Sequence, residues 1–214
     1  MKTHPLAAAA LALALTASAA PALAAAQAFT DVPSSHWAYS SVMEMAERGV
    51  VSGVGNNHYA PDNTISYAEF ATMITRSFFH DQISGGDGST WYSDFMATAE
   101  KVGALAGTKV ASDASVAEGS INRYDMAQVM YNVMVQKGVS APSDFDNSKI
   151  ADWASIPANY QSAVPACYSL GALSGTDANG TFSGTSVMTR AQDAVVMDRL
   201  LELCEGSYRT RDSQ

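Results

Sequence analysis

Two arginines stand where helices are expected to begin, and their position suggests anion binding. Arg123 follows Asn122 and Arg190 follows Thr189, and both preceding residues are of a type that caps helix N-termini. The free N–H groups of a first helical turn and the helix dipole favour an anion. A guanidinium beside them can hold a carboxylate through two hydrogen bonds. The alternative interpretation is that both arginines are solvated residues or partners in intramolecular ion pairs.

Both arginines belong to a two-part pattern that occurs three times along the chain. Its first part is a pentapeptide that begins and ends with glycine, at residues 49–53, 103–107 and 171–175. Its second part opens 16, 18 and 17 residues after the first glycine of each copy, at Ile65, Ile121 and Met188. A long and nearly constant period is typical of a repeat architecture with one supersecondary unit per repeat.

Each repeat is expected to form a helix, a loop and a second helix. The first helix should end at the leading glycine, because a left-handed residue after a helix favours glycine. The second should begin at a Ser, Asn or Thr cap that is followed three residues later by Glu, Asp or Gln. We expect first helices over residues 37–48, 91–102 and 158–170, with Pro165 bending or delaying the last one. The predicted fold is mainly α, with three helix–loop–helix units packed around a pseudo-threefold axis.

The pattern divides the chain into five segments. Residues 1–24 are predicted to be a secretory signal peptide, because Lys2 and His4 precede an apolar run that ends in an Ala-rich cleavage site. Cleavage after Ala26 and an N-terminal helix of the mature protein are the alternatives, and the run is too short to span a membrane. The other segments are repeat one (25–80), repeat two (81–137), repeat three (138–204) and a polar tail (205–214).

The charge balance restricts the class of partner. Without Lys2, the twelve Lys and Arg residues become eleven, against twenty-one Asp and Glu residues. Such an acidic surface argues against nucleic acid and against an anionic membrane. It is compatible with an uncharged glycan, and an anionic ligand would have to be held by a few specific arginines.

Repeat one closely resembles the S-layer homology module. Its matching stretches are Phe29-Thr-Asp-Val32, His36-Trp-Ala-Tyr39, Gly49–Gly53, Tyr59-Ala-Pro61 and Ile65-Ser-Tyr-Ala-Glu-Phe70. Repeat three matches in Gly171–Gly175, Gly180-Thr-Phe182 and Met188-Thr-Arg-Ala-Gln192. Repeat two is the most diverged. Three modules in tandem is the usual number in this family.

The resemblance implies a secreted, non-covalent cell-wall anchor at the cell surface. Modules of this family pack as a three-pronged pseudo-trimer and bind secondary cell-wall polysaccharide, often pyruvylated, in grooves between the prongs. The main ligand residue of the family is the Arg of a Thr-Arg-Ala-Glu motif, which corresponds here to Arg190 and Arg123. Repeat one departs from the motif with Tyr67, which can still stack on a sugar. Gly53, Gly107 and Gly175 are expected to serve backbone geometry. They are also candidate ligand residues, because their N–H groups could face a groove.

Aromatic residues of the repeats have two interpretations each. Trp37 and Trp91 could be sugar-stacking platforms, but their helical spacing from core positions predicts that they are buried. Tyr59 and Phe182 are expected to anchor their loops in the core, and the alternative is that they line a groove.

Four further residues are given structural roles. Asp31 and Asp152 are expected to cap the turns that directly follow them rather than to touch a ligand. Cys167 and Cys204 are a candidate disulfide, because an exported protein can oxidise such a pair and both lie in repeat three. The sequence alone cannot establish that their Cα atoms are within reach.

The sequence carries little support for an enzyme or for a metal-binding protein. The chain carries no motif of a zinc protease, a serine hydrolase or a phosphate-binding loop, and the repeats leave no stretch for a catalytic domain. A calcium loop ending at Glu69 would lack its first carboxylates. We therefore expect no enzyme, no metal site and no cofactor. The remaining rival is a self-assembling or partner-binding surface-layer protein without its own glycan specificity.

Overall fold

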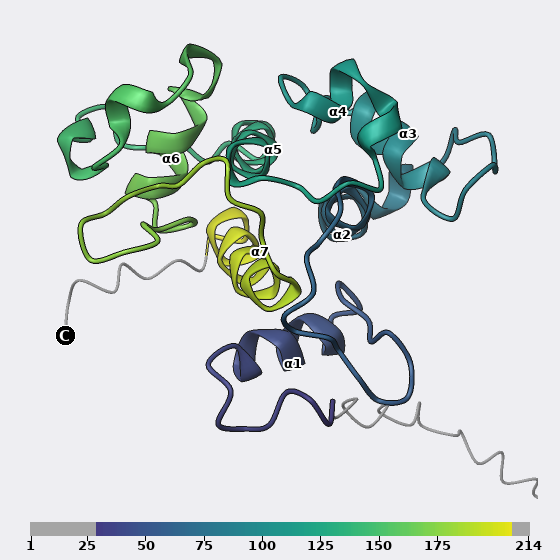
Figure 1. Cartoon of the computed structure of the whole chain (residues 1–214). Coiled ribbons are helices and arrows are strands. Elements are labelled where there is room, and N and C mark those ends of the chain that lie inside the picture. Colours follow the sequence, from purple (N-terminus) through teal and green to yellow (C-terminus); the bar gives the residue numbers. More distant parts are fainter. Residues whose placement is uncertain (1–28, 207–214) are drawn as a thin grey trace, which may run out of the picture.

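The computed structural model describes residues 29–206, so the predicted signal peptide and most of the polar tail lie outside the described residues. The described chain is mainly helical, as predicted. Three long helices lie together at its centre (Figure 1): α2 (Tyr67–Phe78), α5 (Arg123–Gln136) and α7 (Arg190–Cys204). Shorter helices form three lobes around them: α1 (Tyr39–Glu47), α3 (Ser93–Lys101) with α4 (Lys109–Ser112), and α6 (Ala163–Ser169). Within the described range, no helix is both long enough and apolar enough to cross a membrane.

Residues 29–206 also form five 3-10 helices. They span His80–Gln82, Ala114–Val116, Asn147–Lys149, Trp153–Ser155 and Ala158–Tyr160. The short helix α4 was not predicted. It lies in a loop that reads as small and polar, and Thr108 begins it by accepting a hydrogen bond from the N–H of Ala111.

Each outer helix packs on a central helix of the preceding repeat. The pairs are α3 on α2, α6 on α5, and α1 on α7. Backbone hydrogen bonds join the same pairs of repeats, because the first N–H of each central helix donates to a loop carbonyl of the next repeat. The three bonds run from Tyr67 to Gly119 (3.1 Å), from Arg123 to Ser186 (3.0 Å) and from Arg190 to Asn63 (2.8 Å). These contacts favour the predicted pseudo-threefold axis, which stays a prediction.

The helix ends follow the local sequence signals. Ser66 with Glu69 and Thr189 with Gln192 form reciprocal capping boxes. The glycines that end the three first helices are all left-handed, with φ angles of 69°, 75° and 70° at Gly49, Gly103 and Gly171. Each first helix begins later than expected. The third begins at Ala163, which puts Pro165 in the first turn, where no intrahelical N–H donor is needed.

The prediction that Trp37 and Trp91 are core residues is wrong. Their exposed fractions are 65% and 62%. Both precede the first turns of α1 and α3, which begin at Tyr39 and Ser93, so the helical periodicity that predicted burial does not extend to them. Tyr59 and Phe182 are fully buried, as predicted.

The predicted disulfide is also wrong, because Cys167 and Cys204 are free thiols. Cys167 lies on α6, which packs against α5, and its thiol contacts the Ala127 carbonyl at 3.5 Å. Cys204 ends α7, whose main neighbour is α1. Burial raises the pKa of Cys167 to about 12 and that of Cys204 to about 11, so neither is a reactive thiolate at neutral pH.

Candidate functional site

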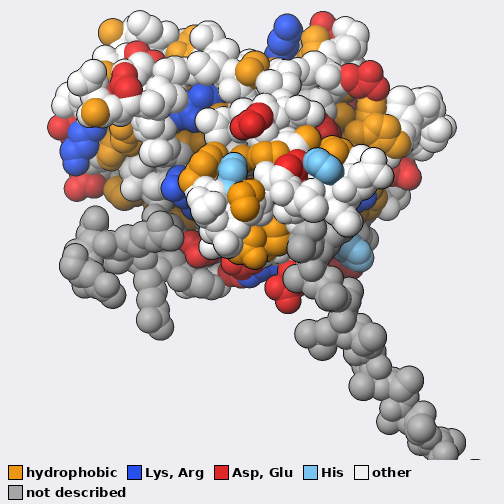
Figure 2. Space-filling view, turned by 60° about the horizontal axis from the view of Figure 1, so that its bottom comes forward, with side chains coloured by type: hydrophobic (Ala, Val, Ile, Leu, Met, Phe, Trp, Pro, Cys, Tyr) orange, Lys and Arg blue, Asp and Glu red, His pale blue; other side chains and the backbone are white. Residues whose placement is uncertain are grey.

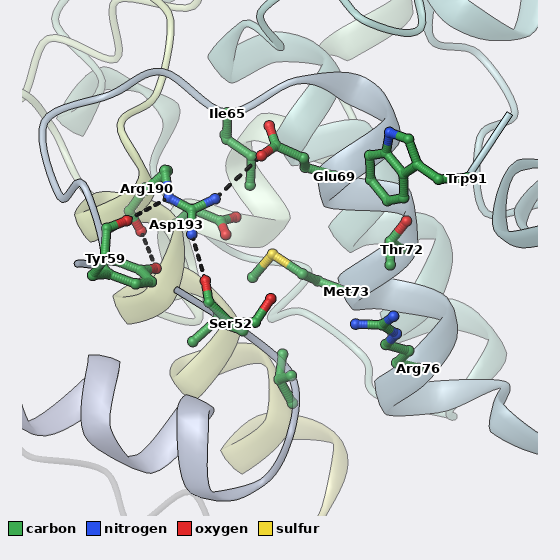
Figure 3. Close-up of a pocket in the computed structure, with 12 residues that line it drawn as sticks. Ser52, Tyr59, Ile65, Glu69, Thr72, Met73, Arg76, Trp91, Arg190 and Asp193 are labelled. Atoms are coloured by element: carbon green, nitrogen blue, oxygen red, sulfur yellow. Dashed lines mark hydrogen bonds and ion pairs between the residues drawn. The ribbon is translucent and has the colours of Figure 1, made fainter. Parts of the chain in front are cut away.

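Arg190 lies between the start of α7 and the loop of repeat one (Figure 3). Its Nε donates to the Tyr59 carbonyl at 2.9 Å and its Nη2 to the Ser52 carbonyl at 2.8 Å. Its Nη1 lies 3.2 Å from a carboxylate oxygen of Glu69, and its guanidinium lies over the Tyr59 ring, 4.7 Å from the centroid. The side chain therefore links two repeats, and we call this link an arginine staple. It also forms a polar part of the wall of a groove.

Arg123 makes the equivalent backbone and ring contacts between repeats two and three, but without the ion pair. Its Nε donates to the Phe182 carbonyl at 2.8 Å and its Nη2 to the Ser174 carbonyl at 2.6 Å, and it stacks on the Phe182 ring at 4.8 Å. The residue is only 6% exposed, and burial lowers its pKa from the ordinary value, although the charge of Asp152 opposes this. Within residues 29–206, Arg123 forms no ion pair.

The sequence argument for anion binding at these helix N-termini needs a correction. In α7, the N–H groups of Arg190 and Ala191 donate to the carbonyls of Asn63 and Pro61, and the N–H of Gln192 donates to the Thr189 side chain. The first turns of α2 and α5 are occupied in the same way. The first-turn N–H groups therefore already have partners, so any anion binding falls to the guanidinium groups and the groove walls.

Asp31 and Asp152 bind the same two loops that Arg190 and Arg123 contact, the loops that carry Tyr59 and Phe182. Asp31 accepts hydrogen bonds from the N–H groups of Tyr59 and Ala60 at 2.8 and 2.7 Å. Asp152 accepts from the N–H groups of Phe182 and Ser183 at 2.6 and 2.9 Å. The prediction that they cap the turns directly after them is wrong, because their partners lie about thirty residues further along the chain. Burial pushes the pKa of Asp31 upward, but these hydrogen bonds hold it below its ordinary value.

The first arginine staple forms one wall of groove A, a cavity of about 110 Å³. Its lining includes Ser52, Tyr59, Glu69 and Arg76 from repeat one, Trp91 from repeat two, and Arg190 and Asp193 from repeat three. Figure 3 shows Trp91 and Arg76 along the α2 side and Arg190 on the opposite side. Groove A thus combines an exposed indole with two guanidinium groups.

Groove B is the equivalent cavity beside Arg123, with a volume of about 280 Å³. Its lining includes Trp37 from repeat one, Arg123 from repeat two, and Ser174, Gly175, Gln192 and Arg199 from repeat three. Arg76 lies nine residues after Tyr67, the first residue of α2. Arg199 lies nine residues after Arg190, the first residue of α7, so the two arginines occupy equivalent positions. The sequence interpretation missed this second arginine, although the repeat alignment contains the signal.

The third equivalent interface is built differently. Tyr67, in the arginine position, donates a hydrogen bond to the fully buried Asp125, which also accepts one from Tyr160 at 2.8 Å. Asn132 replaces the second arginine and donates to the carbonyls of Ala104 and Ala106. Burial, and to a smaller extent the hydrogen bond to Asp125, raises the pKa of Tyr160 to about 12. The same two causes also raise the pKa of Tyr67. Neutral side chains and Asp125 therefore hold this interface, and the Tyr67 hydroxyl group is engaged by Asp125. A ligand-binding role for Tyr67 stays a prediction.

The three candidate glycines have different surroundings. A Cβ atom at Gly53 would lie 2.6 Å from the His58 carbonyl oxygen, and one at Gly175 would lie 2.7 Å from the Cα of Gly180. Both positions therefore require glycine for packing, whatever else they do. Gly107 has a positive φ of 79°. Of the three, Gly175 lines groove B, and a ligand-binding role for all three stays a prediction.

The surface agrees with the acidic composition. On the face that carries α1, Lys and Arg side chains are dispersed among acidic ones rather than gathered into a field (Figure 2). Among residues 29–206, no group of three or more His, Cys, Asp or Glu side chains is arranged to hold a metal ion.

Comparison with known families identifies two segments of the chain. The model of the S-layer homology domain matches residues 28–71 and 149–192, which lie in repeats one and three. The intervening repeat two is not matched by that model.

Three relatives illustrate the similarity. An S-layer protein of Bacillus thuringiensis subsp. finitimus is 27% identical over 151 residues, which cover 64% of this chain and 17% of that protein. The Surface-layer 125 kDa protein of Lysinibacillus sphaericus is 28% identical over 178 residues, covering 78% and 14%. Exoglucanase XynX of Acetivibrio thermocellus is 26% identical over 186 residues, covering 81% and 16%. The chain thus spans less than a fifth of the length of these relatives.

Proposed function

We propose that this protein is a non-catalytic anchor that binds cell-wall polysaccharide through grooves A and B. The observation that carries the proposal is the presence, in both grooves, of one exposed tryptophan and two arginines drawn from all three repeats. An indole face provides an apolar platform for a sugar ring, and guanidinium groups hydrogen-bond to its hydroxyl or carboxylate substituents. The matches to the S-layer homology domain support the same function.

Two competent grooves, rather than three, are part of the proposal. The third interface has Tyr67 and Asn132 where the other two have arginines, and Asp125 takes up the hydroxyl groups of Tyr67 and Tyr160. Neither Tyr67 nor Asn132 therefore presents a cation to an anionic ligand. This difference agrees with the departure of Tyr67 from the family motif.

Repeat two is proposed to be a third, diverged S-layer homology module. Its helix α5 has the position, cap and leading arginine of α7, and its helix α3 packs on α2 as α1 packs on α7. Repeat two has no counterpart of Asp31 and Asp152, and none of the aromatic loop residues Tyr59 and Phe182. Its sequence therefore lies further from the family pattern. The location that follows is the cell surface, after secretion.

The test is co-sedimentation of the purified protein with bacterial sacculi, before and after non-peptidoglycan polymers are stripped from them. Binding that is lost on stripping supports a polysaccharide anchor. Binding that survives stripping moves the ligand to peptidoglycan. If the folded protein does not bind at all, the anchor proposal fails.

The rival function is a surface-layer protein that assembles with itself or with a partner protein. It predicts concentration-dependent association in analytical ultracentrifugation, without sacculi. A monomer that sediments with sacculi would exclude it, whereas association without wall binding would favour it.

A further inference from the structure

Asp193 is a buried carboxyl group in the lining of groove A. The residue is fully buried, and neither carboxylate oxygen has a hydrogen-bond partner among residues 29–206. Figure 3 shows it beside the Arg190 side chain. A buried carboxyl without a partner destabilises the fold, because the hydrogen bonds that it makes to water in the unfolded chain are not replaced.

The equivalent positions show that the fold does not need an acid there. Asp193 is the fourth residue of α7, and the fourth residues of α2 and α5 are Phe70 and Met126. Both are buried apolar core residues, with exposed fractions of 1% and 0%. An acid at this position therefore has no packing role, and it occurs at the helix start that borders groove A.

The two grooves consequently differ in charge. In groove A the Arg190 guanidinium is paired with Glu69 at 3.2 Å, and Asp193 adds a second carboxyl group. In groove B the position of Glu69 is taken by the neutral Gln192, and two arginines line the cavity. Groove B is thus cationic and has no acidic side chain in its lining, whereas groove A holds one ion-paired carboxylate, Glu69, and one buried carboxyl group, Asp193.

We propose that groove A takes an uncharged sugar residue whose hydroxyl groups hydrogen-bond to Asp193 and Glu69, while groove B takes an acidic substituent of the polymer. The inference rests on the proposed function and names the ligand class of each groove. A carboxylate ligand would be repelled by Glu69 in groove A, whereas a hydroxyl group can both donate to a carboxyl oxygen and accept from a guanidinium.

Burial also raises the pKa of Asp193 well above its ordinary value, against the opposing charge of Arg190. A protonated carboxyl group donates one hydrogen bond and accepts others, as a hydroxyl group does. The protonated Asp193 carboxyl group and a sugar hydroxyl group can therefore hydrogen-bond to each other within the groove.

The test compares two forms of purified wall-polysaccharide fragments by isothermal titration calorimetry. One form is native, and in the other the carboxyl groups are reduced to alcohols. The variants are Asp193→Leu, which removes the hydrogen-bonding group, and Asp193→Asn, which keeps one donor and one acceptor. Arg199→Ala is the matched control in groove B.

For the reduced polysaccharide, we expect Asp193→Leu to lose at least about tenfold in affinity, because sugar hydroxyl groups are left buried without partners. Asp193→Asn should stay within about threefold of the wild type, since an amide preserves hydrogen bonding. Arg199→Ala should weaken binding of the native form only. The inference would be overturned if Asp193→Leu bound the reduced polysaccharide with the affinity of the wild type.

A wild-type protein that binds the native but not the reduced form would also overturn it, and would leave the anchor function standing. Failure to bind either form would instead refute the anchor function itself. A second readout does not depend on Asp193→Leu folding. In a Trp37→Phe/Trp153→Phe background, Trp91 is the one tryptophan left of the three in the sequence. The reduced polysaccharide should then change the fluorescence of Trp91, and an unchanged spectrum at saturating polymer would count against groove A.

Discussion

The Nη2 atom of Arg190 donates to the carbonyl oxygen of Ser52 at 2.8 Å, across 138 residues of sequence. Arg123 makes the equivalent bond to Ser174 at 2.6 Å. Each arginine therefore joins a helix of one repeat to the loop of the next. A loss of wall binding in an arginine variant would consequently have two causes, the loss of the ligand contact and the loosening of the repeat interface.

The first prediction separates these causes through stability. Arg123→Met should reduce the free energy of unfolding by about 2–4 kcal/mol, because the buried Phe182 carbonyl and the part-buried Ser174 carbonyl lose their charged donor. Urea denaturation measures this. Arg48→Met is the control, because Arg48 makes surface ion pairs with Glu44 and Glu205 that contribute at most about 1 kcal/mol. Equal stabilities of the two variants would contradict the staple role.

The second prediction concerns Asp31. Asp31→Ala should destabilise the protein by about 1–3 kcal/mol at neutral pH, because two backbone N–H groups of the Tyr59 loop lose their acceptor. The folded-state pKa of Asp31 lies below its unfolded value, so this stability is present above the unfolded pKa of about 4 and is lost as pH falls through the folded pKa. The difference between variant and wild type should therefore shrink in acid. Asp87→Ala, in an exposed turn, should not reproduce the loss of stability at neutral pH.

The third prediction has the opposite sign. The folded-state pKa of Asp193 is raised, so the protonated form is favoured and stability falls as pH rises from about 4 towards the folded pKa. Asp193→Leu should remove this dependence, and its advantage over the wild type should grow with pH. Thermal unfolding at pH 4, 5, 6 and 7 measures the trend. A constant difference between the two proteins would show that Asp193 has an ordinary pKa.

The fourth prediction concerns the third interface. The Tyr160 phenol, which donates to Asp125, should ionise near pH 12 in the folded protein rather than near 10. Because its folded pKa is raised, this contribution to stability is complete below pH 10 and is lost as pH rises towards 12. Ultraviolet titration at 295 nm of wild type and Tyr160→Phe isolates the group. Tyr160→Phe should bind sacculi as the wild type does, and reduced binding would make the third interface a competent site.

The helices were predictable because their signals are local. Capping residues such as Ser66 and Thr189, and a left-handed glycine such as Gly49, depend on a few neighbouring residues. The resemblance to the family motif also located Arg123 and Arg190 correctly at the helix starts. What the sequence could not provide was their partners, since Ser52 and Ser174 contact them only when different repeats pack together.

The errors also have a common origin in packing between repeats. Helical periodicity assigned Trp37 and Trp91 to the core, but the helices begin after them and the two indoles lie at grooves formed with other repeats. In the same way, the acceptors Asp31 and Asp152 meet loops about thirty residues away. Aligning α7 with α2 and α5 would have revealed Asp193 as an acid in a core position, but its burial depends on the packed fold.

The central claim is tested most directly by the Trp37→Ala/Trp91→Ala double variant in the sacculus assay. Both indoles are more than half exposed, so the free energy of unfolding should change by no more than about 0.5 kcal/mol per substitution. The control is Val54→Ala/Val135→Ala, which trims two exposed apolar side chains that do not line the two grooves. We predict that the tryptophan variant stays folded and loses at least about tenfold in affinity for unstripped sacculi, while the control binds as the wild type does. Wild-type affinity of the folded tryptophan variant would contradict the account, because the grooves would then not be the binding site.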